Sequence, residues 1–78
     1  MKLTVESLID YFRDSMNIAD PINPDTELFS TGLLDSVGLM NVVAYVEQTA
    51  RIDVRAADVT LENFDSPNRI VAYASSQA

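Results

Sequence analysis

Gly32-Leu33-Leu34-Asp35-Ser36-Val37 marks the junction between a long irregular segment and the most apolar predicted helix of the chain. The run from Val37 to Ala50 has no proline and one glycine, which predicts a helix over residues 36–50. Asp35 and Ser36 are both favoured N-cap residues, because their oxygens accept from the unpaired N–H groups of the first turn. Ser36 therefore has two candidate roles. It caps the helix, or it bears a phosphate ester, which the N–H groups and the helix dipole would stabilise.

The chain offers nothing that would activate Ser36 as a nucleophile. Serine catalysis normally needs an adjacent base such as histidine, and the sequence contains neither histidine nor cysteine. It has no clustered pair of carboxylates for acid–base chemistry, and the acids of the loop lack the order of a calcium site. We therefore expect no catalytic residue and no metal site, so that any chemistry at Ser36 is performed by another enzyme.

Length and composition favour a single domain over residues 1–78. A hydrophobic content of 47% is too high for a disordered acidic tail. The first residues resemble neither a signal peptide nor a membrane span, and the lack of cysteine fits a reducing compartment, so we expect a cytoplasmic monomer. The net charge of −7 disfavours nucleic acid and anionic lipid. This charge either steers the protein toward partners with basic patches or only keeps it soluble.

The segments around this junction predict an all-α fold, a small four-helix bundle of three main helices and one short helix with a long first loop. Thr4 can cap the first helix, whose apolar residues form one stripe. Two prolines in the following segment indicate a loop, in which residues 25–29 are a candidate helical turn. The predicted ranges are a helix over about 4–16, a loop over 17–35, and helices over 36–50, about 60–64 and 66–75.

Local signals also define the C-terminal half. Residues 51–55 form an extended connector, and Thr60 caps the short helix that places Phe64 in the core. Ser66-Pro67 is a strong start signal for the last helix, with serine at the N-cap and proline at the first helical position.

The helix over residues 36–50 has two apolar faces. At 100° per residue, the face expected in the core contains Leu39, Val42, Val46 and Ala50. The other face, which carries the serine, contains Ser36, Met40, Val43 and Glu47 and is flanked by Val37. This second face is a partner surface, the mouth of an acyl pocket, or simply part of a central helix that is apolar all round.

The stretch from Gly32 to Val37 resembles the Asp-Ser-Leu phosphopantetheine attachment motif of acyl carrier proteins and peptidyl carrier domains, with Val37 in place of leucine. The surrounding features match as well: a small acidic chain, a central serine, a helix and long loop before it, and the run from Leu61 to Ser66 after it. The resemblance extends from about Thr4 to Tyr73.

This resemblance implies that a phosphopantetheinyl transferase uses coenzyme A to attach 4′-phosphopantetheine to Ser36. The terminal thiol would then hold an acyl or aminoacyl group as a thioester. A loading ligase and downstream acyl-transfer enzymes with basic patches would be the other partners. Asp35 matches the acid before the serine and is expected to contribute to the cofactor site. The residues expected to contact partners are Asp35, Val37, Met40, Val43 and Glu47.

The predicted recognition helix departs from that of fatty-acid carriers, which usually have more acids where this chain has Gly38, Asn41 and Gln48. This difference favours a dedicated carrier in a specialised pathway. The alternatives are a general fatty-acid-synthesis carrier and a carrier-like regulatory module that is never modified.

Overall fold

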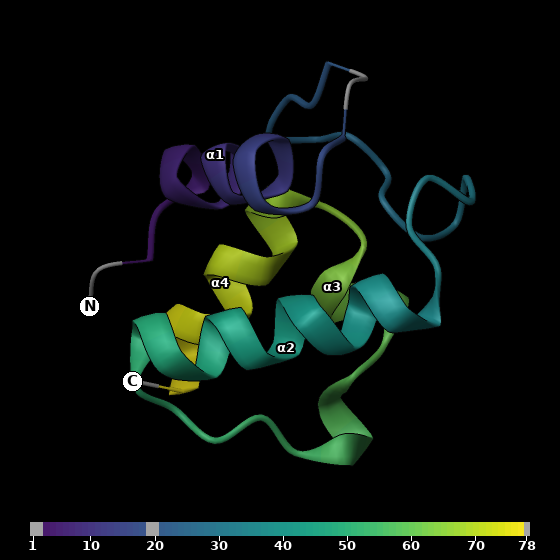
Figure 1. The fold of residues 1–78 in the computed structure, drawn as a ribbon. Helices are drawn as coiled ribbons and strands as arrows, with labels where there is room; N and C mark the ends of the chain where they lie inside the picture. Colours follow the sequence, from purple (N-terminus) through teal and green to yellow (C-terminus); the bar gives the residue numbers. More distant parts are fainter. Residues whose placement is uncertain (1–2, 19–20, 78) are drawn as a thin grey trace.

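The computed structural model describes residues 3–18 and 21–77, and this part of the chain is an all-α bundle of four α-helices with one 3-10 turn (Figure 1). The helix bounds lie within two residues of the predicted ranges. The elements are α1 (Val5–Ser15), α2 (Ser36–Ala50), η1 (Ala56–Asp58), α3 (Leu61–Phe64) and α4 (Pro67–Gln77).

The N-terminus of α1 is fixed by the predicted cap. The Thr4 hydroxyl accepts a hydrogen bond from the Ser7 N–H at 3.0 Å, and the Ser7 hydroxyl accepts one from the Thr4 N–H at 3.0 Å. This reciprocal pair satisfies two N–H groups that would otherwise lack a partner. Leu8 and Phe12 then point into the core, so the predicted apolar stripe is confirmed at its centre.

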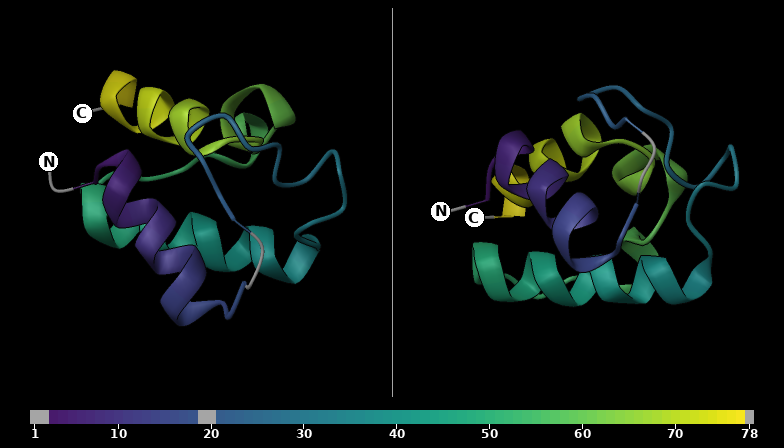
Figure 2. Two further views of the ribbon diagram at one scale, coloured as in Figure 1. Left: turned by 90° about the horizontal axis from the view of Figure 1, so that it is seen from above. Right: turned by 45° about the horizontal axis from the view of Figure 1, so that its top comes forward.

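The core lies where the four helices meet, with α4 in contact with both α1 and α3. Helix α2 runs along one side of this assembly, as the two further views show (Figure 2). The Tyr11 and Tyr45 rings stack with centroids 4.0 Å apart and join α1 to α2. The buried apolar residues are Leu3, Leu8, Phe12, Leu28, Leu34, Val42, Val46, Ala50, Phe64, Ile70, Tyr73 and Ala74.

The first loop contains no helix over residues 25–29, so that prediction is wrong. Asn23 instead begins a turn, in which its carbonyl accepts from the Thr26 N–H at 3.1 Å and its side chain accepts from the Asp25 N–H at 2.9 Å. The next N–H groups are also committed, because those of Leu28 and Phe29 donate to Asp65. A helical turn would require these donors for its own hydrogen bonds.

The segment between α2 and α3 follows its prediction except for η1. Arg51 ends α2 in the left-handed conformation with φ of 57°, and Ile52 and Val54 are half-buried. Asp58 in η1 accepts hydrogen bonds from three later residues, through its carbonyl from Thr60 and Asn63 and through its carboxylate from Tyr73. These hydrogen bonds stabilise a turn that the local sequence does not predict.

The two later start signals are confirmed. The Thr60 hydroxyl accepts from the Asn63 N–H at 3.3 Å, and the Ser66 hydroxyl accepts from the Arg69 N–H at 3.2 Å, with Pro67 as the first residue of α4. Phe64 is buried, as expected. Over the described ranges, none of the helices combines the length and the hydropathy that crossing a membrane requires.

Candidate functional site

Ser36 is exposed at the first position of α2, and Asp35 is the residue that caps the helix. The Asp35 carboxylate accepts from the Gly38 N–H at 2.9 Å, and the Asp35 carbonyl accepts from the Leu39 N–H at 2.9 Å. The sequence left the cap open between Asp35 and Ser36, and the structure assigns it to Asp35. Within residues 3–18 and 21–77, the Ser36 hydroxyl makes no hydrogen bond, so the fold leaves it available to solvent.

Two N–H groups remain at this end of α2. In the described part of the chain, the N–H groups of Ser36 and Val37 have no acceptor, because the Asp35 cap uses only those of Gly38 and Leu39. Unpaired N–H groups and the helix dipole favour an oxyanion in this position. The Asp35 carboxylate partly offsets this effect, because it already carries a negative charge in the same turn.

The loop that leads to Ser36 is anchored by Asp65, which follows α3. Asp65 Oδ1 accepts from the N–H groups of Phe29 at 2.7 Å and Ser30 at 3.0 Å, and Oδ2 accepts from the Ser30 hydroxyl at 2.7 Å. The Asp65 carbonyl accepts from the Leu28 N–H at 2.6 Å, and the Leu28 carbonyl accepts from the Leu34 N–H at 2.8 Å. A continuous series of hydrogen bonds therefore runs from Asp65 to the residue before the helix cap.

Asp65 is buried, with 5% of its surface exposed, and yet it remains an acceptor of several hydrogen bonds. Burial alone would raise the pKa of its carboxyl group. The hydrogen bonds from Ser30 and Phe29, together with the charge of Arg69, lower that pKa below its ordinary value of 3.8. This role could not be predicted from local sequence signals, because the loop residues lie 35 and 36 positions away.

The residues predicted to contact partners do not share one environment. Val37 and Met40 project into solvent, with 69% and 68% of their surfaces exposed, whereas Val43 is half-buried. The Glu47 carboxylate accepts from the Val54 N–H at 3.0 Å and thereby fastens the connector after α2. Its contribution to recognition stays a prediction, since this contact gives it a structural role. Leu61 on α3, which the sequence reading did not single out, is 52% exposed.

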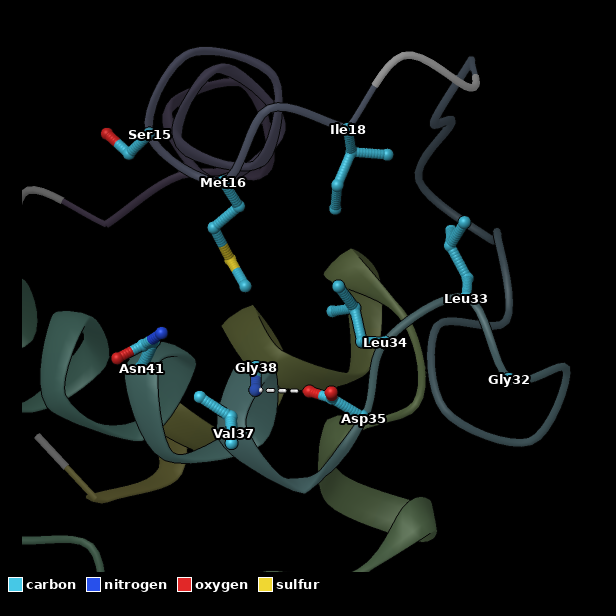
Figure 3. A pocket seen from close by; sticks show the side chains of 10 residues that line it. All are labelled: Ser15, Met16, Ile18, Gly32, Leu33, Leu34, Asp35, Val37, Gly38 and Asn41. Atoms are coloured by element: carbon cyan, nitrogen blue, oxygen red, sulfur yellow. Dashed lines mark hydrogen bonds between the residues drawn. The ribbon is translucent and has the colours of Figure 1, made fainter.

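A pocket of about 530 Å³ opens beside the start of α2 (Figure 3). Its apolar lining comes from the end of α1, the first loop and α2, namely Met16, Ile18, Leu33, Leu34 and Val37. Asp35 and Asn41 add polar groups. Figure 3 shows the Met16 side chain reaching from the end of α1 toward Gly38. Gly38 is buried, and a Cβ atom there would lie 3.3 Å from Met16 Cε and 3.4 Å from Leu34 Cβ.

This arrangement suits a serine that is modified by another protein. The hydroxyl is exposed at the capped N-terminus of α2, and the chain has no histidine or cysteine to activate it. No group of three or more potential metal-ligating side chains gathers among residues 3–18 and 21–77.

Comparison with known proteins shows the family of this chain. Residues 6–74 match the family described as a phosphopantetheine attachment site. Relatives include the D-alanyl carrier protein of Lacticaseibacillus rhamnosus, which is 34% identical over 50 residues, 64% of this chain and 62% of that protein. The D-alanyl carrier protein of Bacillus velezensis is 37% identical over 49 residues, 63% of each chain. The one from Lactobacillus acidophilus is 28% identical over 75 residues, 94% of this chain and 92% of that protein.

The chain thus spans 62% and 63% of the length of the first two relatives that it matches. No solved structure matches it significantly.

Proposed function

Because this chain belongs to the phosphopantetheine-attachment family of carrier proteins, whose cofactor is covalently bound 4′-phosphopantetheine, we propose that Ser36 is the attachment site. In this proposal the protein carries an acyl or aminoacyl group and delivers it to partner enzymes in a specialised pathway. It is a cytoplasmic monomer that catalyses no reaction itself.

The observation that carries this proposal is the uncommitted hydroxyl of Ser36. Asp35 performs the capping, so modification of Ser36 would remove no hydrogen bond from the described fold. The N–H groups of Ser36 and Val37 are suitable donors for an ester phosphate at this position. The structure therefore fits the cofactor through its donor set and through the exposure of the acceptor hydroxyl.

When attached, the arm supplies a thiol that holds the acyl group as a thioester, and its thiolate is a good leaving group because thiols ionise near pH ~8.5. The chain contributes position and recognition. Val37 and Met40 offer apolar contacts beside Ser36 to the transferase, the loading ligase and the downstream enzymes. The net charge of −7 attracts the basic surfaces of such partners over a longer range.

For the cargo, the relatives point to an aminoacyl group. The three compared carriers are named for D-alanine, and the start of α2 has Gly38 and Asn41 where fatty-acid carriers usually place acids. We therefore place D-alanine first among the groups to be tested.

The proposal is tested by incubating the protein with coenzyme A, Mg²⁺ and a promiscuous phosphopantetheinyl transferase, followed by intact mass measurement and peptide fragmentation. One phosphopantetheine increment located on Ser36 is the expected result. Ser36→Ala should remain unmodified, whereas Ser75→Ala, which alters an exposed serine on α4, should be modified like the parent protein.

A known carrier in the same tube shows that the transferase is active. If that carrier is converted and this protein is not, the proposed function is refuted and an unmodified interaction module takes its place. Loading that persists in Ser36→Ala would move the attachment site to another residue. The loaded protein is then offered to D-alanine-activating and fatty-acyl-activating ligases, and the acylated mass identifies the cargo class.

A further inference from the structure

We propose that Asp65 is a positioning residue for the modification of Ser36, an inference that rests on the proposed function. Among the described residues, Asp65 forms no hydrogen bond with Ser36, and it acts on the serine through the end of the first loop. Its hydrogen bonds hold these loop residues in the conformation from which α2 begins. The phosphopantetheinyl transferase binds that conformation.

Two helix ends determine where Asp65 lies. It is the C-cap residue of α3, and its N–H donates to the Leu61 carbonyl at 3.0 Å. The next residue, Ser66, caps α4 through the Arg69 N–H. Because both neighbouring helices fix its backbone, the carbonyl and the carboxylate of Asp65 are presented to the loop from a defined position. The residue is only 5% exposed, so water competes little for these acceptors.

The contacts continue from Asp65 to the start of α2. The Asp65 carbonyl accepts from the Leu28 N–H at 2.6 Å, and the Leu28 carbonyl accepts from the Leu34 N–H at 2.8 Å. Leu34 directly precedes Asp35, whose side chain caps the helix (Figure 3). Leu28 and Leu34 are buried, whereas Ser36 is exposed. The buried pair therefore connects the anchor to the exposed hydroxyl.

The turn over residues 29–33 depends on the Asp65 carboxylate. The middle of the turn is exposed, and a Cβ atom at Gly32, where φ is 82°, would meet no atom within 4 Å. Asp65 holds the turn through the N–H groups of Phe29 at 2.7 Å and Ser30 at 3.0 Å, and through the Ser30 hydroxyl at 2.7 Å. Removing the carboxylate should let this turn adopt other conformations, because sparse packing and exposure favour local opening.

The transfer itself depends on the position of the Ser36 hydroxyl. Its Oγ atom forms a bond to the phosphorus of coenzyme A that bears the pantetheine arm, and the P–O bond of the pyrophosphate breaks. Adenosine 3′,5′-bisphosphate leaves with the electron pair, and the hydroxyl proton passes to a base of the transferase. This displacement requires the attacking and leaving oxygens to be aligned. A displaced turn would move Leu34 and the cap residue, and with them the hydroxyl.

The proposal predicts which kinetic constant changes. When only a fraction of the free protein has the conformation that a partner binds, the apparent affinity falls by that fraction. A fall to roughly a tenth would raise KM about tenfold. The kcat would stay unchanged, because the saturated complex contains only the bound conformation. A residue that merely stabilised the fold would change neither constant as long as the variant remained folded.

The test is the steady-state kinetics of a promiscuous phosphopantetheinyl transferase at saturating coenzyme A, with the concentration of this protein varied. For Asp65→Ala we expect KM to rise about tenfold and kcat to stay as in the parent. Asp65→Asn should restore part of the affinity, because its amide oxygen can still accept from the Phe29 N–H. Circular dichroism at the assay temperature shows that each variant is folded.

Two matched controls separate positioning from stability and from charge. Leu8→Ala opens a cavity in the core on α1 and lowers stability without removing a hydrogen bond from the loop. Asp53→Ala removes one negative charge, as Asp65→Ala does, but from an exposed position after α2. Both variants should keep the parent KM, since neither changes the conformation of the loop.

Amide hydrogen exchange gives a second readout, which needs no enzyme. The Leu34 N–H, which donates to Leu28, is compared with helical amides in the middle of α2. In Asp65→Ala its exchange should become about tenfold faster relative to these amides, as the same change of population predicts. In Leu8→Ala this ratio should stay as in the parent.

If Asp65→Ala does not fold, Ser30→Ala decides, because it removes only the hydrogen bonds of an exposed hydroxyl to Asp65 and Glu27. It should raise KM about threefold by the same effect on the population, and an unchanged KM overturns the positioning role.

Three results with a folded Asp65→Ala overturn the positioning role and leave the proposed function intact. They are a KM equal to that of Asp53→Ala, an equal rise of KM in Leu8→Ala, and a lower kcat at unchanged KM. Failure of the parent to accept the arm at Ser36 refutes the proposed function instead, so the two failures are distinguishable.

Discussion

Replacing Asp65 with alanine should destabilise the protein more than replacing any exposed acid. The substitution removes the acceptor for the N–H groups of Phe29 and Ser30 and for the Ser30 hydroxyl. Hydrogen bonds to a charged group contribute about 1.5–3 kcal/mol each. Ser30 is exposed, so water can replace its share, and we expect a net loss of about 3 kcal/mol. A chain of 78 residues has a stability of only ~4–12 kcal/mol in total.

Urea denaturation followed by far-ultraviolet circular dichroism measures this loss. With a slope of about 1 kcal/mol per molar for a small domain, the unfolding midpoint of Asp65→Ala should fall by roughly 2–3 M. Asp65→Asn should fall between Asp65→Ala and the parent, because the amide oxygen still accepts from Phe29 but carries no charge.

Asp53→Ala is the matched control, since Asp53 is an exposed acid in the connector after α2. Its midpoint should move by an amount equivalent to less than ~0.5 kcal/mol. If Asp65→Ala unfolds at the same urea concentration as Asp53→Ala, the hydrogen bonds to Asp65 do not stabilise the loop, and the expected loss of about 3 kcal/mol is refuted.

Four further outcomes are expected. Asp35→Ala should lower stability by about 1 kcal/mol and Ser36→Ala by less than ~0.5 kcal/mol, measured in urea; the reverse order would contradict the assignment of the cap. The pKa of the Asp65 carboxyl is lowered in the folded state, so the stability that this group contributes is complete above pH ~3.8 and is lost as the pH falls through the folded pKa. Acid should therefore lower the free energy of unfolding more in the parent than in Asp65→Asn. Parallel plots of that free energy against pH for the two proteins would argue against this. Burial and the hydrogen bond to Asp58 raise the pKa of Tyr73 above 10.0, so the stability that Tyr73 contributes is complete below pH ~10 and is lost as the pH rises through the folded pKa. Urea denaturation at a series of alkaline pH values should therefore show a smaller loss of stability for Tyr73→Phe than for the parent. Added NaCl or Mg²⁺ should raise the Tm at pH 7 by screening the net charge of −7, and a Tm indifferent to salt would count against self-repulsion.

The sequence predicted the features that depend on local signals. Thr4, Thr60 and Ser66 all cap as expected, because a cap involves residues only three positions apart. The all-α class followed from helical spacing in the same way. At α2 the local signal was ambiguous, since Asp35 and Ser36 are adjacent residues of equally favourable type. The structure shows that it is the Asp35 carboxylate that accepts the hydrogen bond from the Gly38 N–H.

The missed features are contacts between distant residues. Nothing near Asp65 indicates that its carboxylate binds the loop before α2, and nothing near Glu47 indicates that it binds the Val54 N–H. The same explanation holds for residues 25–29, where Leu28 donates to the distant Asp65, and for η1, where Asp58 accepts from Tyr73. At the candidate site, the sequence predicted Ser36 with its apolar neighbours Val37 and Met40; all three are exposed in the structure, and their role stays a prediction. The pocket between α1 and α2 could not be predicted, because it depends on Met16 lying close to Gly38 and residue spacing does not reveal that contact.

The anchoring of the first loop by Asp65 has a consequence for the order of events during protein synthesis. Ser36 leaves the ribosome before Asp65, and Ser30 is separated from its acceptor by 35 positions. A nascent chain that has reached α2 but not the end of α3 therefore displays the serine on a loop that nothing yet holds. The segment before Ser36 becomes fixed only when the C-terminal half has been made and has folded against it. A modifying enzyme that requires this fixed conformation would therefore act only after the segment through Asp65 has folded.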